Sequence, residues 1–163
     1  MKILLLLLCS CSLGFSQNQI NSFYGTNGFV STDVTAATAL NHGTGGPNQT
    51  WSFSGFLPLG TSTYSYVLPT TTETSTYPGT NNIILTSSLQ GAIASEGRMY
   101  TKNTAGSVSI TGLNSADLTI NFNGGTNGSG NATLGVFPMT YPFSNTDNTV
   151  SGSYVNGTNT GTF

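Results

Sequence analysis

The sequence predicts an all-β fold, either an antiparallel β-sandwich or an open, curved sheet. Short runs in which apolar and polar residues alternate recur along the chain, and clusters of Gly, Asn, Ser and Pro separate them. This pattern is typical of strands joined by turns. Helical periodicity is almost absent. Only 5% of the residues are charged whereas 10% are aromatic, which is the composition of a packed domain rather than of a disordered chain.

The first half of the chain contains three expected strands, at residues 50–56, 64–68 and 82–87. The first alternates aromatic and small residues, so Trp51 and Phe53 share one face. Pro69 ends the second strand because proline cannot donate to the ladder. The third includes Ile83, Ile84 and Leu85, a run that suits burial on both faces.

Two polar segments are expected outside the strands. Residues 33–40 are the best helix candidate, one or two turns long, and Asp33 is a suitable N-cap for it. The sequence Glu96-Gly97-Arg98 resembles an exposed turn with a local ion pair that stabilises little.

The second half predicts a compact meander and a final hairpin. Strands are expected at residues 98–101, 108–113, 118–122 and 132–141, and two short strands within 150–163. Turns are expected at 103–106 and 114–115, with Asp117 as a turn residue, and at Asn156-Gly157. Pro138 breaks the strand at 132–141 and places it at an edge or a bulge. Strict alternation directs five side chains of the meander inward: Val108, Ile110, Leu118, Ile120 and Phe122.

Residues 1–16 have the features of a secretory signal peptide. Lys2 supplies the positive charge, residues 3–8 the apolar segment, and Gly14 and Ser16 the small residues before a cleavage site between Ser16 and Gln17. The segment is shorter than the roughly 20 residues that span a bilayer, and no later segment is apolar enough to do so. The chain therefore divides into a signal peptide at 1–16 and one β-rich domain at 17–163.

Both cysteines, Cys9 and Cys11, lie inside the signal segment. An alternative is lipoprotein processing at one of them, but residues 8–11 lack the usual small residue two positions before the acceptor. After cleavage between Ser16 and Gln17 the domain has no cysteine. Its stability must therefore come from core burial and strand pairing rather than from disulfides.

The small negative net charge restricts the classes of partner that the chain is expected to bind. The formal net charge is −2, from 3 basic and 5 acidic residues. Nucleic acid and anionic membrane surfaces require clustered Lys and Arg, so neither is an expected partner. A glycan or another envelope component remains possible, and no feature specifies an oligomeric state.

Several short motifs resemble one known group of secreted proteins. Residues 46–54, Gly-Pro-Asn-Gln-Thr-Trp-Ser-Phe-Ser, resemble a stretch near the N-terminus of many Bacteroidota proteins that usually carry a C-terminal type IX secretion sorting domain. Seven further segments are similar to later parts of the same module. They are residues 100–102, Leu113, 117–120, 137–141, 151–154, 157–158 and 161–163. The resemblance implies export and a location in the periplasm, at the cell surface or outside the cell. It implies no enzymatic activity.

The chain departs from this group in two ways. Ser52 stands where the group commonly has Asp. The glycine-rich strand expected after Phe163 and the sorting domain are not in the sequence, which ends in a strand-like stretch at residues 161–163. We therefore expect a chain that is truncated at its C-terminus relative to the group.

The sequence offers little for catalysis. His42 is the only histidine, and His42-Gly43-Thr44-Gly45-Gly46 resembles the oxyanion-hole loop of esterases. No G-x-S-x-G nucleophile motif accompanies it, however. The five acids are widely spaced, so neither a pair of glycosidase carboxylates nor a grouped set of metal ligands stands out. We therefore expect no enzyme, no cofactor and no metal site, with an enzyme working through His42 as the weakest alternative.

The leading hypothesis is an exported, non-catalytic β-module with a structural or adhesive role. The alternative is a neutral carbohydrate-binding module, because tyrosines among Asn, Thr and Ser suit uncharged sugars. Its candidate glycan contacts are Tyr64, Tyr66 and Tyr141. Aromatics that alternate along strands are more often core or cross-strand pairs, and Trp51 is expected to be buried.

Overall fold

A computed structural model describes residues 19–25, 27–36, 55–124, 130–140, 144 and 149–163. Several expected features lie outside the described residues. They are the signal peptide with its cleavage site at Ser16 and Gln17, the segment with His42 and Trp51, and Tyr141.

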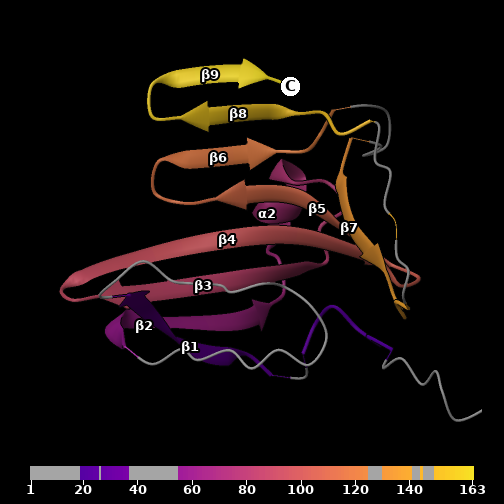
Figure 1. Ribbon diagram of the computed structural model, residues 1–163. Helices are drawn as coiled ribbons and strands as arrows, with labels where there is room; N and C mark the ends of the chain where they lie inside the picture. Colours follow the sequence, from indigo (N-terminus) through magenta and orange to yellow (C-terminus); the bar gives the residue numbers. More distant parts are fainter. Residues whose placement is uncertain (1–18, 26, 37–54, 125–129, 141–143, 145–148) are drawn as a thin grey trace, which may run out of the picture.

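The described chain is all-β and forms one open, antiparallel sheet of nine strands, as the sequence predicts (Figure 1). The strands are β1 (Phe29–Ala36), β2 (Phe56–Val67), β3 (Asn82–Gln90), β4 (Ile93–Thr104), β5 (Ser107–Asn114), β6 (Leu118–Asn121), β7 (Ala132–Val136), β8 (Ser153–Asn156) and β9 (Asn159–Thr162). One short helix, α2 (Thr71–Thr76), follows β2. No described helix has the length and hydropathy needed to cross a bilayer.

The sheet divides in two at β5. Strands follow the order β1-β2-β3-β4-β5-β6-β8-β9, and β7 pairs with β5 off this path. The second edge of β5 pairs with β7 over residues 107–110 and with β6 over residues 112–114. Between these halves Thr111 is the extra residue of a register shift opposite Tyr100 and Thr101 of β4. A bulge of this kind increases the local twist of the strand, and this twist separates the part of β5 that pairs with β6 from the part that pairs with β7.

Tight turns join the long central strands. Gln90 pairs with Ile93 and Thr104 with Ser107, so two residues form each turn. The second turn, Ala105-Gly106, has positive φ at both positions, and such turns match the twist of the strands they join. The expected turns at 103–106 and around Asn156-Gly157 are confirmed, since Gly157 has a φ of +58° between β8 and β9.

A small core lies between α2 and the sheet. Tyr77, at the end of α2, stacks on Tyr100 of β4 with ring centroids 3.8 Å apart. Ile83 completes the cluster, and Val67 packs against it. A capping box begins α2, since the side chains of Thr70 and Glu73 each accept a hydrogen bond from the other's backbone N–H.

The expected inward residues of the meander are buried to different extents. Val108 is fully buried, whereas Ile110, Leu118, Ile120 and Phe122 are half-buried. Of the isoleucine run, Ile83 is fully buried and its neighbours Ile84 and Leu85 are half-buried. Within the described residues, these strand side chains are therefore less covered than the inner faces of a packed sandwich.

Three local predictions differ from the structure. Asp33 lies within strand β1 and is not a helix N-cap, because β1 pairs with β2 and the Ser62 hydroxyl donates to the Asp33 carboxylate over 2.7 Å. Glu96 and Arg98 belong to β4 and not to a turn, because the reversal comes earlier, at residues 91–92. Their ion pair is present, at 3.0 Å. The strand expected at 132–141 ends at Val136, before the cis Phe137–Pro138 peptide.

Candidate functional site

The cross-strand register gives the sheet two distinct faces. Since side chains alternate along a strand, residues paired across strands share a face. Arg98 and Tyr100 lie on the face that α2 covers, which is here called the α2 face. Tyr64 and Tyr66 lie on the other face, here called the Tyr66 face, where Tyr24 packs on Tyr66.

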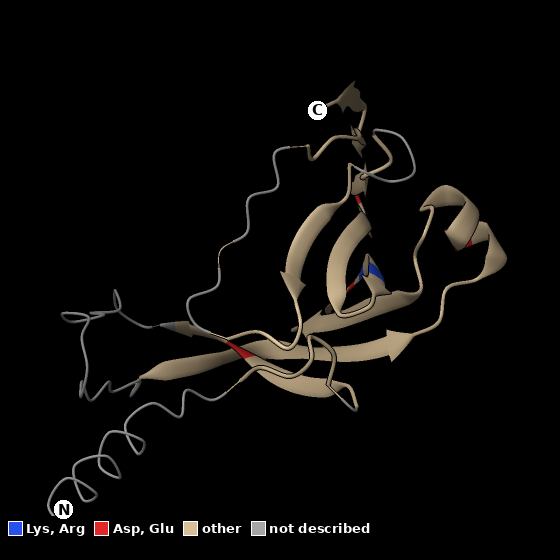
Figure 2. Ribbon diagram, turned by 90° about the vertical axis from the view of Figure 1, so that its right-hand side faces the viewer, with Lys and Arg blue, Asp and Glu red and all other residues tan. Residues whose placement is uncertain are grey.

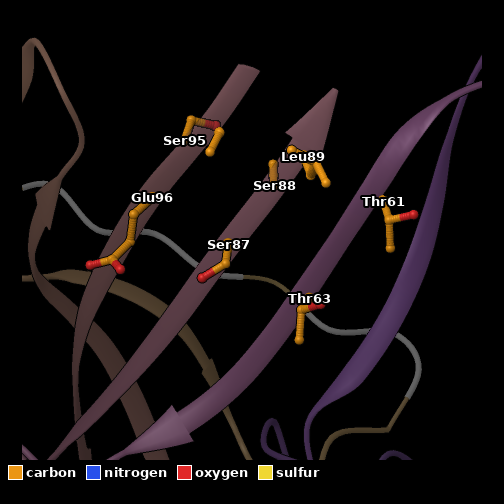
Figure 3. A pocket seen from close by; sticks show the side chains of 8 residues that line it. Thr61, Thr63, Ser87, Ser88, Leu89, Ser95 and Glu96 are labelled. Carbon is orange, nitrogen blue, oxygen red and sulfur yellow. The ribbon is translucent and has the colours of Figure 1, made fainter. Parts of the chain in front are cut away.

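A shallow groove of about 590 Å³ lies over β2, β3 and β4, and most of its lining belongs to the α2 face (Figure 3). Its residues form two cross-strand rows, Thr63–Ser87–Glu96 and Thr61–Leu89–Ala94. All six are exposed, and Ser88 and Ser95 of the same strands complete the lining. The volume is in the range of small-molecule sites, but the groove is an open trough rather than an enclosed cavity.

The groove is nearly neutral. Its only charged residue, Glu96, binds Arg98, whose Nη2 lies 3.0 Å from Oε1 and whose Nε donates to the same oxygen over 3.0 Å. The hydrogen bonds that Arg98 donates to Glu96 raise the pKa of the Arg98 guanidinium. The remaining lining offers hydroxyl groups and aliphatic carbon. Such a surface can donate hydrogen bonds to a ligand, accept them from it, and pack against its apolar parts. It has no net field that would attract a strongly charged ligand.

Arg98 also joins β4 to the helix. Its Nη1 lies 2.9 Å from Oε1 of Glu73 in α2, and the Tyr100 hydroxyl donates to the same oxygen over 3.4 Å. The pKa of Glu73 is lowered, first by the Thr70 backbone N–H, then by the Thr70 hydroxyl and by Arg98. Two carboxylates thus share one guanidinium.

A seam of serines crosses the Tyr66 face at the level of the groove. Ser31, Ser62, Ser88 and Ser95 are successive cross-strand partners. The buried Ser62 hydroxyl has one proton, which it donates to Asp33, so the 2.7 Å contact with Ser88 has Ser88 as donor. This series of hydroxyl groups satisfies the hydrogen-bonding requirement of the buried Ser62 and of the Asp33 carboxylate.

The two predicted glycan contacts that the structure describes lie on the face opposite the groove. Tyr66 meets Tyr24 edge to face at 5.7 Å, and its hydroxyl accepts the Gly25 N–H over 3.2 Å. Tyr64 stacks on Phe29 at 4.3 Å with an interplanar angle of 12°. Phe29 is 53% exposed, so one aromatic stack reaches the surface. Tyr66 is engaged within the molecule.

The groove residues are not among the sites expected from sequence. The available signal is the alternation Thr61-Ser62-Thr63 in β2, where threonines occupy an exposed face and serine the buried one. Residues 56–63 carry Pro58 and Gly60, which disfavour a strand, so the N-terminal part of β2 is not apparent. Within the part of the chain that the structure describes, no three His, Cys, Asp or Glu side chains group as metal ligands.

Comparisons with known proteins found no relative. No family model matches the chain, and neither the curated proteins nor the solved structures include a significant match.

Proposed function

We propose that this chain is an exported, non-catalytic β-module of a bacterial envelope or secreted protein, and that it adheres to a neutral polymer through the groove over β2, β3 and β4. The observation that carries this proposal is the open, nearly neutral trough of mostly hydroxyl and aliphatic side chains, in which the charge of Glu96 is paired with Arg98. Export rests on the signal-peptide features of residues 1–16 and on the resemblance to Bacteroidota proteins with type IX sorting domains.

The chemistry of the groove favours a neutral polysaccharide. A sugar chain presents hydroxyl edges, which pair with Thr61, Thr63 and Ser87, and C–H faces, which pack on Leu89 and Ala94. Strands lie about 4.8 Å apart and alternate side chains about 7 Å apart, so the hydroxyls form a regular array. An extended polymer can contact such an array repeatedly, whereas a small substrate would be held by few of its groups.

The arrangement of the carboxylates supports a non-catalytic role. Glu73 and Glu96 both bind Arg98, at 2.9 and 3.0 Å. Asp33 accepts the Ser62 hydroxyl proton on the other face. Each of these acids has a structural partner, and none of them projects alone into the groove.

Co-sedimentation with insoluble polysaccharides tests the proposal. The purified protein is mixed with cellulose, chitin or an insoluble β-1,3-glucan, and the bound fraction is measured. We expect binding to at least one of them, and Ser87→Glu to weaken it at least tenfold because it buries an unpaired charge against the sugar. Thr104→Glu, at the far end of β4, is the matched control. Absence of binding, or equal binding by Ser87→Glu, contradicts the proposal.

A second candidate uses the Phe29–Tyr64 stack. Phe29 presents an exposed ring on which a sugar face can pack, as in aromatic carbohydrate platforms. In the same assay this candidate expects Phe29→Ala to abolish binding and Ser87→Glu to leave it unchanged. The two variants lie on different strands, so the two candidates are separable.

A further inference from the structure

We propose that Glu96 is the specificity-determining residue of the groove, because its carboxylate can accept hydrogen bonds from free hydroxyl groups of a polysaccharide and disfavours acidic polysaccharides. This inference rests on the proposed function. Glu96 is the only charged residue among the described residues that line the groove, and its side chain is 53% exposed. It ends the cross-strand row that also contains Thr63 and Ser87 (Figure 3).

One carboxylate oxygen of Glu96 is occupied and the other is open. Arg98 donates to Oε1 from Nε over 3.0 Å, and its Nη2 lies 3.0 Å from the same atom. No described group forms a hydrogen bond or ion pair with Oε2. An ionised carboxylate only accepts hydrogen bonds, at about two sites on each oxygen. Oε2 is therefore a charged acceptor that a ligand in the groove can use.

The Glu96 side chain is held in place before a ligand binds. Its partner Arg98 is itself fixed, since Nη1 of Arg98 lies 2.9 Å from Oε1 of Glu73. The other oxygen of Glu73 accepts the backbone N–H and the hydroxyl of Thr70, each over 2.8 Å. A ligand does not have to order this side chain, which reduces the entropic cost of binding.

The three side chains of the row differ in the hydrogen bonds they can make. The hydroxyls of Thr63 and Ser87 donate or accept, whereas Glu96 only accepts. A sugar hydroxyl beside Oε2 can donate to it, and hydrogen bonds to a charged acceptor are about twice as strong as neutral ones. A carboxylate or sulfate at the same place has no proton to donate and meets a like charge, which is unfavourable at an interface.

Arg98 does not compensate for this preference. Its Nε and Nη2 contact Glu96, and its Nη1 contacts Glu73, so each of its three guanidinium nitrogens already has a carboxylate partner. An acidic ligand would have to compete with these two carboxylates for Arg98. The row therefore favours polymers with free hydroxyl groups over acidic polymers.

Binding isotherms on two solids test this inference. One is the neutral polymer that retains the most protein, and the other is a cross-linked, insoluble carboxymethyl derivative of the same polymer. We expect the original protein to bind the acidic solid at least tenfold more weakly. Glu96→Gln keeps an acceptor for Arg98 but has no charge. It should bind the neutral polymer about fivefold more weakly and reduce the ratio of the two dissociation constants at least fivefold.

The matched control is Asp117→Asn. Asp117 is an exposed acid in the turn before β6 and is outside the groove lining, so this variant has the same net charge as Glu96→Gln. It should keep both dissociation constants within twofold of the original values. A measurement on the unaltered protein needs no variant: the carboxyl carbon resonance of Glu96 should shift when a soluble oligosaccharide of the neutral polymer is added, and that of Asp117 should not.

This inference and the proposed function fail on different results. If the original protein binds no neutral polymer, the proposed function is wrong and this inference falls with it. If the protein binds but Glu96→Gln keeps both dissociation constants, or Asp117→Asn changes them equally, only this inference is overturned. A Glu96 resonance that does not move at saturating oligosaccharide would also overturn it.

Discussion

At the scale of single residues, Glu73 connects the start of helix α2 to strand β4. It accepts hydrogen bonds from the backbone N–H and the hydroxyl of Thr70, and it binds Arg98 of β4. The sequence signal for this role is the Thr70-x-x-Glu73 spacing of a capping box. The ion pair with Arg98 depends on tertiary structure and is not visible in the sequence.

Glu73→Gln should reduce the loss of stability in acid. The pKa of Glu73 is lowered in the folded state, so its stabilisation is present above the unfolded value of about 4.3 and is lost as the pH falls through the folded pKa. Glutamine can keep the capping box but has no charge. Urea unfolding at pH 7 and pH 3 should show a difference smaller by up to about 1 kcal/mol in the variant. An unchanged difference would contradict this role.

Tyr100 should make the fold sensitive to alkaline pH. Burial, followed by the charges of Tyr77 and Glu73, raises the pKa of Tyr100 to about 12. The stabilisation that the protonated Tyr100 hydroxyl contributes is fully present below the pKa of about 10 that tyrosine has in the unfolded chain. It is lost as the pH rises towards 12. Tyr100→Phe should therefore flatten the fall in unfolding free energy between pH 10 and 12, measured by urea unfolding. An equal slope in both proteins would disprove the contribution of Tyr100.

At the scale of elements, the alternation along strands is predictable from sequence. The position of helix α2 and the branching of the sheet at β5 are not. Strands β5 and β6 and the β8–β9 hairpin match their expected positions because turn glycines and alternating apolar residues specify them locally, whereas β4 begins at Ile93, before the start expected at residue 98. Asp33 was expected to begin a helix, yet β-branched neighbours and pairing with β2 place it in a strand. The six-residue α2 has little apolar periodicity, and its packing through Tyr77 stabilises it.

Gly112 should be essential for the packing of α2 against the sheet. A Cβ at this position would overlap the Tyr77 ring, so Gly112→Ala must displace the helix or the ring. We expect destabilisation of about 1–3 kcal/mol by urea unfolding.

The matched control for Gly112 is Gly97→Ala in β4. The nearest atom to a Cβ on Gly97 is the Asn114 carbonyl oxygen, at 3.9 Å. This substitution should change the unfolding free energy by less than about 0.5 kcal/mol. Equal effects of the two substitutions would show that Tyr77 does not pack on β5 as described.

At the scale of the whole molecule, the sheet is open, and its described strands carry few charged residues (Figure 2). Only four hydrophobic residues among those described are buried, namely Tyr77, Ile83, Tyr100 and Val108. Sequence composition predicts the all-β class but not the division of the sheet at β5, because that division depends on a bulge and on pairing between distant segments. The groove likewise requires the register of three strands, which alternation within one strand does not specify.

The measurement that tests the proposed adhesive role most directly is a binding isotherm on insoluble polysaccharide. The original protein, Ser87→Glu, Phe29→Ala and Thr104→Glu are compared on the polymer that retains the most protein. We predict that Ser87→Glu raises the dissociation constant at least tenfold, while Phe29→Ala and Thr104→Glu leave it within twofold. Equal affinity of Ser87→Glu and the original protein, or no binding to any neutral polymer, would contradict adhesion through the groove.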